Sequence, residues 1–257
     1  MTATVDAACR TSRSLMGRVR IALRLSAMLL WLIICVPLYY VWRILRLHNP
    51  WPRLFLGGIA RIAGAQVNVE GAPYKKGAFL LANHVSWLDI PVIAGVTGSA
   101  FVAHSGLAEH GLLKWLCQMN DTVFVARHDR RSVHTQVEHV RAALTDTGAL
   151  TVFPEGTTSD GTGLLPFKSS LLSALDPPPE GIAIQPVWLD YGADVTAMAW
   201  VGEEPGLDNF LKILARRRRQ CVTVHFLPSL DASETANRKT MAVAARERIM
   251  MAIARKR

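Results

Sequence analysis

Apolar and polar residues along the chain form two kinds of pattern. From residue 66 onward, short apolar runs are separated by longer segments in which apolar residues recur at helical intervals. The short runs predict strands at 66–70, 78–82, 99–103, 122–125, 149–153, 182–189, 195–201 and 221–226. The longer segments predict helices at 86–96, 107–119, 131–144, 165–175, 207–217 and 233–255. This alternation indicates an α/β fold: a mixed, largely parallel sheet covered by helices on both faces.

The N-terminal region is different, because its apolar run is long and continuous. Residues 25–42 are 18 residues without a charge, at the lower end of the length that spans a bilayer. Pro37 is expected to kink a helix there. A second apolar run, 54–63, is too short to cross a bilayer. Arginines lie on both sides of the first run, so no positive-inside asymmetry fixes an orientation.

These two runs predict an N-terminal membrane-associated helical pair that dips into one leaflet, with its arginines at the lipid phosphates. A single spanning helix is the second interpretation. A cleaved signal peptide is the least favoured, because no small-residue cleavage site follows Cys35 convincingly. The chain therefore divides into a flexible N-terminus (1–16), membrane-anchoring helices (17–64) and an α/β domain (65–257).

Charge and composition favour a membrane partner. The net charge of +9 suits an anionic partner, and a hydrophobic content of 50% favours an anionic membrane surface over a nucleic acid. The run Arg216 to Arg219 is either a solvated helix end or a contact with lipid headgroups. The four cysteines show no metal-ligand spacing, so we expect no metal and reduced thiols in a protein facing the cytosol. We also expect no cofactor.

The chemistry centres on the stretch Asn-His-Val-Ser-Trp-Leu-Asp at 83–89, which follows a predicted strand. Five helical steps would place His84 and Asp89 about 140° apart, so the pair can meet only if His84 lies in the loop before the helix. Ser86 then fits the N-cap of a capping box with Asp89 at N3. Asp89 would orient His84 as a general base, or would only cap the helix while His84 is an ordinary turn residue.

Several polar residues follow different predicted strands. His84, His104, Arg127 and Glu155 each lie just past a carboxyl end. If these strands are parallel, their ends open on one edge of the sheet, where open α/β folds bind ligands. Residues that are distant in sequence would then share one crevice.

A second motif, Phe-Pro-Glu-Gly-Thr at 153–157, lies about seventy residues after the first. Two further blocks are Phe-Val-Ala-Arg at 124–127 and Gln-Pro-Val at 185–187. Their order from about residue 51 to 191 closely resembles the glycerolipid acyltransferase family, whose founding activity is acylation of 1-acylglycerol 3-phosphate. The resemblance implies that residues 65–257 are an acyltransferase domain at the inner membrane, facing the cytoplasm.

The resemblance also implies roles for the site residues. His84 and Asp89 would be catalytic, without a covalent acyl-enzyme; a Ser-His-Asp hydrolase is the rival, but no serine stands in a Gly-x-Ser-x-Gly elbow. A catalytically silent lipid-binding protein on the same fold is a further alternative. Acceptor binding would fall to Glu155 and Gly156, and the residue pattern adds, as substrate-binding candidates, Arg127, Thr157, Thr158 and Lys168. Glu155 could instead hold a loop, and Arg127 could form a surface ion pair.

The acceptor and the donor are less closely specified. Many relatives that acylate acylglycerol phosphate carry Arg where Thr158 stands and a lysine near His104, and losing cations weakens phosphate binding. The sequence at 155–161 is also similar to that of the lyso-ornithine lipid acyltransferase branch. Because Arg127 is present, 1-acyl-sn-glycerol 3-phosphate remains the favoured acceptor, with lyso-ornithine lipid a close second. The donor is an acyl-carrier-protein or coenzyme A thioester, which the sequence does not distinguish.

Overall fold

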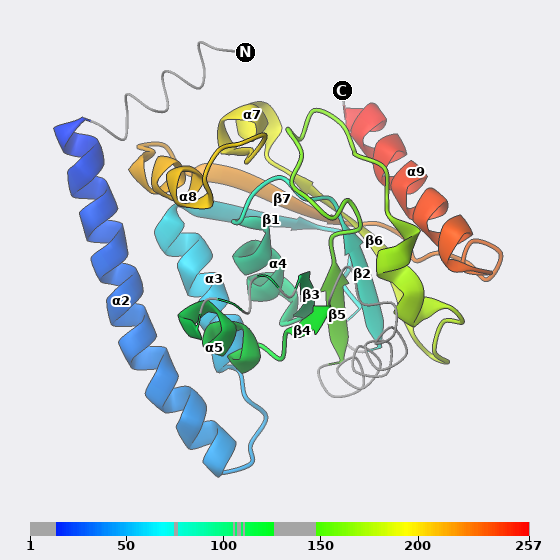
Figure 1. Ribbon diagram of the computed structural model, residues 1–257, viewed down its shortest axis with the longest axis horizontal. Helices are drawn as coiled ribbons and strands as arrows, with labels where there is room; N and C mark the ends of the chain where they lie inside the picture. Colours follow the sequence, from blue (N-terminus) through cyan, green and yellow to red (C-terminus); the bar gives the residue numbers. More distant parts are fainter. Residues whose placement is uncertain are drawn as a thin grey trace.

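The computed structural model of the protein describes residues 14–74, 77–104, 106, 109, 111–125 and 148–256 (Figure 1). Within these residues the strands form one sheet in the order β1-β7-β6-β2-β5-β3-β4. Their bounds are β1 (Ala65–Glu70), β2 (Ala78–Ala82), β3 (Ala100–His104), β4 (Val123–Val125), β5 (Ala149–Val152), β6 (Ala183–Asp190) and β7 (Gln220–Phe226). All adjacent pairs are parallel except β6 and β7, which confirms the predicted mixed, largely parallel sheet.

Helices cover both faces of the sheet. They are α2 (Leu15–Ile44), α3 (Trp51–Ala63), α4 (Asp89–Thr97), α5 (Gly111–Met119), α7 (Val195–Met198), α8 (Gly206–Ala215) and α9 (Arg238–Lys256), with 3-10 turns η2 (Ser169–Leu175) and η3 (Gly192–Asp194). The central strand β2 shows the division: Ala78, Leu80 and Ala82 pack with α3, α4 and α8, whereas Phe79 and Leu81 pack with η2 and α9. Figure 1 shows α2 and α9 on opposite sides of the sheet.

Two predicted elements are wrong. Residues 195–201 contain the short helix α7 instead of a strand, because both neighbours of β6 are already taken by β2 and β7. Residues 165–168 are not helical; Pro166 cannot continue a helix, and η2 begins only at Ser169. The predicted helix at 131–144 lies outside the described residues.

The N-terminal apolar run forms one helix of 30 residues, α2, which begins ten residues before the predicted run. The Ser14 side chain accepts a hydrogen bond from the Gly17 N–H and caps its start. By length and composition alone, α2 is a helix that could cross a membrane. The second run forms α3, which ends at Gly64 in the left-handed conformation.

Two arginines of α2 donate hydrogen bonds to backbone carbonyls of the protein, which the sequence did not predict. The Arg20 guanidinium donates to the carbonyl of Ala215, and Arg24 donates to the carbonyls of Ile213 at 3.2 Å and Leu214 at 2.9 Å. These carbonyls lie at the C-terminus of α8, where a cation also suits the helix dipole. Helix α2 is thereby joined to the α/β domain.

Helices α3 and α4 cross at two glycines. A Cβ on Gly95 would lie 2.6 Å from the Cα of Gly57, which is too close for any side chain. The two backbones therefore touch directly. This contact fixes α3, and through it the N-terminal helical pair, against the helix that begins at Asp89.

Candidate active site

His84 and Asp89 meet at the carboxyl end of β2. His84 lies two residues beyond the strand, Asp89 is the first residue of α4, and the His84 Nδ1 is 2.7 Å from the Asp89 Oδ2. The same oxygen accepts the N–H groups of Val85 at 2.6 Å and Ser86 at 2.9 Å. Since Asp89 accepts from amides that can only donate, its carboxylate also accepts from the Nδ1–H of His84. The Nε2 of His84 is then the nitrogen that can accept a proton.

The predicted capping box is half right. Helix α4 begins at Asp89 with Leu88 at the N-cap, so Ser86 is not the N-cap residue. Asp89 nevertheless reaches back to the Ser86 N–H, as the acidic member of a capping box does. The Ser86 side chain is fully buried and accepts from the Leu88 N–H at 3.4 Å. The turn therefore serves to hold Asp89 under His84.

Tyr191, just after β6, completes the surroundings of Asp89. Its hydroxyl donates to the Asp89 Oδ1 at 2.5 Å, and both side chains are buried. Burial, and next the charge of Asp89, raise the pKa of Tyr191 well above its ordinary value, so the hydroxyl keeps its proton. Tyr191 was not among the site residues predicted from the sequence. Its only signal was a tyrosine placed after the strand that carries the Gln-Pro-Val block.

Glu155 lies beside His84 but faces the protein backbone. One carboxylate oxygen accepts the His84 N–H at 2.8 Å and the other accepts the Leu165 N–H at 2.9 Å. The residue is 1% exposed, and burial raises the pKa of its carboxyl, which the two amide hydrogen bonds oppose. This geometry fits the alternative in which Glu155 holds a loop.

The loop after β5 supports the imidazole from a second direction. The Phe153 ring stacks on the His84 ring, with centroids 4.1 Å apart and an angle of 16° between the planes. The Ser159 N–H and hydroxyl both donate to the His84 carbonyl, at 2.8 and 3.1 Å. Both motifs therefore meet at His84, whose side chain is 17% exposed.

The remaining loop residues differ in how open they are to a ligand. The Gly156 N–H donates to the Phe153 carbonyl at 3.0 Å, and the Thr158 hydroxyl donates to the Trp200 carbonyl, so both groups serve the loop itself. Thr157 is exposed. Lys168 is exposed and its ammonium lies over Gly156, since a Cβ on that glycine would be 3.0 Å from the Nζ. Lys168 is thus a cation at the rim of the loop.

Comparisons with known proteins agree with this geometry. The Acyltransferase family profile matches residues 66–190. The chain is 32% identical to the lyso-ornithine lipid O-acyltransferase of Rhodobacter capsulatus, over 90% of this chain and 89% of the relative. The chain belongs to the acyltransferase family.

Two other proteins are also similar to this acyltransferase. The 1-acyl-sn-glycerol-3-phosphate acyltransferase of Neisseria gonorrhoeae is 31% identical over 68% of this chain and 69% of its own. The crystal structure of the 1-acyl-sn-glycerophosphate acyltransferase PlsC from Thermotoga maritima superposes with a TM-score of 0.61. That alignment covers 92% of this chain and 97% of PlsC at 20% identity, and it shows a shared fold.

The structure brings most of the predicted site residues of the acyltransferase to one rim of the sheet. His84, Asp89 and Glu155 are linked by hydrogen bonds, and the loop that carries Gly156, Thr157 and Thr158 adjoins them. His104 ends β3, a neighbour of β5. Arg127 lies outside the described residues, so its contact with a head group stays a prediction.

The serines near His84 are not placed as nucleophiles in the part of the chain that the structure describes. Ser86 is buried below the turn, and the Ser159 hydroxyl donates to a carbonyl. Among the described residues, neither serine hydroxyl forms a hydrogen bond with the imidazole. The arrangement therefore suits direct attack by a substrate hydroxyl whose proton passes to the open Nε2.

Proposed function

We propose that the protein is a membrane-bound O-acyltransferase that moves a fatty acyl group from an acyl thioester to the free hydroxyl of a lysolipid. The observation that carries the proposal is an imidazole whose Nδ1 is held by a buried carboxylate and whose Nε2 is left open. Membership of the acyltransferase family and relatives named for lysolipid substrates support it.

The proposed reaction needs one base and no covalent intermediate on the protein. The acceptor hydroxyl passes its proton to the Nε2 of His84 while its oxygen attacks the thioester carbonyl. The tetrahedral intermediate collapses, the carbon–sulfur bond breaks, and the thiolate takes the proton from the imidazolium to leave as a thiol. Asp89 stabilises the imidazolium during these steps and fixes the ring orientation.

For the acceptor we rank lyso-ornithine lipid ahead of 1-acyl-sn-glycerol 3-phosphate. This reverses the order that the sequence motifs alone suggested. The match to the lyso-ornithine lipid acyltransferase of Rhodobacter capsulatus covers nine-tenths of this chain, whereas the Neisseria match covers about two-thirds. Thr158, which stands where many phosphate-specific relatives have Arg, uses its hydroxyl to bind the Trp200 carbonyl. Lys168 could pair with the carboxylate of the ornithine head group or with a phosphate.

For the membrane we propose attachment through α2 and α3 at the cytoplasmic face of the inner membrane. Large apolar side chains are exposed along the whole of α2, including Leu15, Leu23, Leu30, Ile33 and Ile44. Exposed apolar surface of this extent marks a membrane or protein contact. Helix α5 extends this surface, since its exposed Leu112 lies near Trp115, whose indole N–H donates to the Tyr40 hydroxyl of α2 at 3.0 Å.

The test is thiol release from an acyl thioester that depends on added lysolipid. We expect His84→Ala to lower the rate by about 10²–10⁴-fold, the range for loss of a general base, while His48→Ala, an exposed histidine of the α2–α3 connection, retains full activity. Full activity of the purified His84→Ala protein would reject the base assignment. Thiol release without an acceptor would identify a hydrolase, and no release with any acceptor would identify a lipid-binding protein.

The acceptor ranking is tested by supplying lyso-ornithine lipid and lysophosphatidate side by side, with acyl-carrier-protein and coenzyme A thioesters as donors. We expect higher kcat/KM with lyso-ornithine lipid. Higher kcat/KM with lysophosphatidate, together with loss of that preference in Arg127→Ala, would restore the phosphate acceptor to first place.

A further inference from the structure

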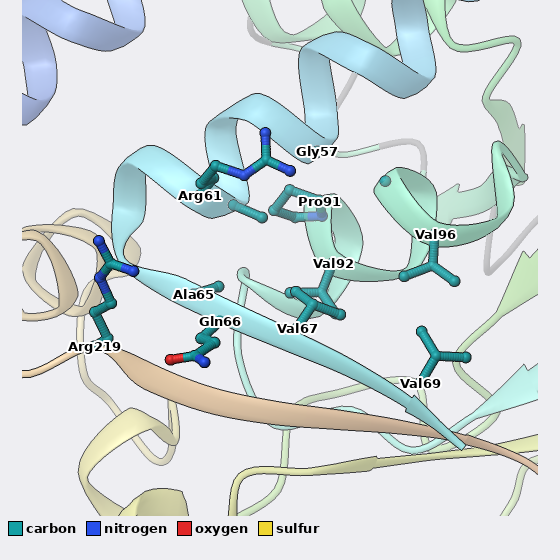
Figure 2. Close-up of a pocket in the computed structure, with 12 residues that line it drawn as sticks. Gly57, Arg61, Ala65, Gln66, Val67, Val69, Pro91, Val92, Val96 and Arg219 are labelled. Atoms are coloured by element: carbon teal, nitrogen blue, oxygen red, sulfur yellow. The ribbon is translucent and has the colours of Figure 1, made fainter.

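An open groove lies on the α3–α4 side of the sheet, away from His84. It runs between α3, α4 and the edge strand β1 and has a volume of about 430 Å³, within the range of small-molecule sites. Figure 2 shows its lining residues. Nine of them are apolar or glycine, and the others are Arg61, Gln66 and Arg219.

The groove is polar at one end and apolar at the other. Figure 2 shows Arg219 beside Ala65 at one end, whereas Val69 and Val96 lie at the opposite end. Arg61 projects from α3 over the groove near Pro91. Both arginines are exposed, and within the described residues neither guanidinium has an ion pair or side-chain hydrogen bond. This polarity matches a molecule with an anionic head and an apolar tail.

The groove is separate from the site around His84. None of His84, Asp89, Phe153 and Glu155 lines it. Helix α4 divides the two, because its first residue, Asp89, directs its carboxylate to His84 while Pro91 and Val92 form part of the groove wall. The groove is therefore formed by residues other than those that surround His84.

We propose that this groove binds one anionic phospholipid of the membrane, with its phosphate at Arg61 and Arg219 and an acyl chain along Val67, Val69 and Val96. Guanidinium groups form strong, charge-assisted hydrogen bonds with phosphate. The acyl chain covers Val69, which is 46% exposed on the edge strand. The site rests on the proposed function only in requiring a membrane, and its role is to hold the α/β domain in a fixed pose on the bilayer.

The experiment measures lipid retention, not acyl transfer. The full-length protein is delipidated in neutral detergent and incubated with phosphatidylglycerol or phosphatidylcholine. Native mass spectrometry then measures the mass of the protein with any lipid that it retains. We expect one phosphatidylglycerol to be retained in preference to phosphatidylcholine. The variant Arg61→Glu/Arg219→Glu should bind it at least about tenfold more weakly, because charge-assisted hydrogen bonds are lost, and Val69→Trp should bind it weakly because the indole fills the apolar end.

Two matched variants complete the test. Arg217→Glu changes the charge of an exposed arginine that does not line the groove, and Val243→Trp adds an indole on the exposed surface of α9; both should retain phosphatidylglycerol. Equal retention of the two lipids, or equal loss in Arg217→Glu and the double variant, would overturn the proposal. Inorganic phosphate that competes as well as phosphatidylglycerol would identify a simple anion site and overturn it too. Because retention needs no turnover, an inactive protein that retains phosphatidylglycerol would refute only the proposed function.

Discussion

At the scale of single residues, Asp89 is the most heavily constrained group in the site. It accepts four hydrogen bonds, two from backbone amides and one each from His84 and Tyr191, and it has no solvent exposure. A buried carboxylate is stable only with such partners, because an unpaired buried charge is costly. The orientation of the imidazole thus depends on groups that never touch the substrate.

We predict that Tyr191→Phe lowers kcat about tenfold and leaves KM nearly unchanged. The substitution leaves the Asp89 Oδ1 without its donor inside the protein, which costs about 1–3 kcal/mol. Steady-state kinetics with purified protein measure the effect. Tyr74→Phe, whose hydroxyl is a surface partner of Ser229, is the control and should change neither value. A rise in KM with unchanged kcat would assign Tyr191 to substrate binding.

We predict that Glu155→Gln destabilises the protein by about 1–3 kcal/mol, because the new NH₂ group faces one of the two amides that Glu155 accepts from. The loss depends on pH. The pKa of Glu155 is raised from its ordinary value of 4.5, so the folded state holds this proton more tightly than the unfolded chain does. The stabilisation that the protonated Glu155 gives to the folded state is complete below pH 4.5, and it is lost as pH rises through the folded-state pKa.

The free energy of unfolding of the native protein should therefore approach that of Glu155→Gln as pH rises above about 4.5. Denaturant unfolding at several pH values measures the difference, with Glu203→Gln, an exposed position, as control. A difference that widens with pH would mean that the two amide hydrogen bonds outweigh burial.

Sequence patterns identified His84, Asp89 and Glu155 because motif residues are local and carry distinctive chemistry. They could not assign the hydrogen bonds of Glu155, whose two partners lie 71 and 10 residues away. Tyr191 was missed because its partner is 102 residues away and a tyrosine after a strand has many uses. The residue types were predictable; the pairings are products of the tertiary fold.

At the scale of elements, α3 and α4 cross with their backbones in direct contact. We predict that Gly95→Ala lowers the melting temperature by roughly 2–10 °C, because overpacking costs about 1–3 kcal/mol and the nearby atoms belong to the Gly57 backbone. Alanine favours helix formation, so the change cannot be ascribed to propensity. Gly111→Ala in α5, with nothing within 4 Å of its Cβ position, should not lower the melting temperature.

Secondary structure was predicted correctly for strands that are buried on both faces of the sheet. It was predicted wrongly for a segment at the rim of the sheet. The runs at 78–82 and 149–153 are apolar apart from Thr151, and they form the central strands β2 and β5. Residues 195–201 have a strand-like composition, but the Trp200 N–H donates to the Val85 carbonyl and the segment covers the site. Composition does not reveal whether a sheet edge is available for pairing.

At the scale of the whole molecule, α2 and α8 are joined by arginine side chains across almost 200 residues of sequence. We predict that Arg24→Ala increases hydrogen exchange in the last turn of α8, because the carbonyls of Ile213 and Leu214 lose a charged donor worth about 1.5–3 kcal/mol. Arg18→Ala removes an exposed arginine of the same helix and should leave the exchange rates unchanged. Equal exchange in both variants would show that these hydrogen bonds do not stabilise α8.

The pairing of the first strand with the last has a consequence for biosynthesis. Within the residues that the structure describes, strand β1 pairs only with β7, and the acceptors of Arg20 and Arg24 lie just before β7. About 150 residues separate β1 from β7, so at 5–20 residues per second the ribosome needs roughly 8–30 s to supply that partner. During this interval β1 waits without its partner strand, and α2 waits without the carbonyls of α8 to which Arg20 and Arg24 donate.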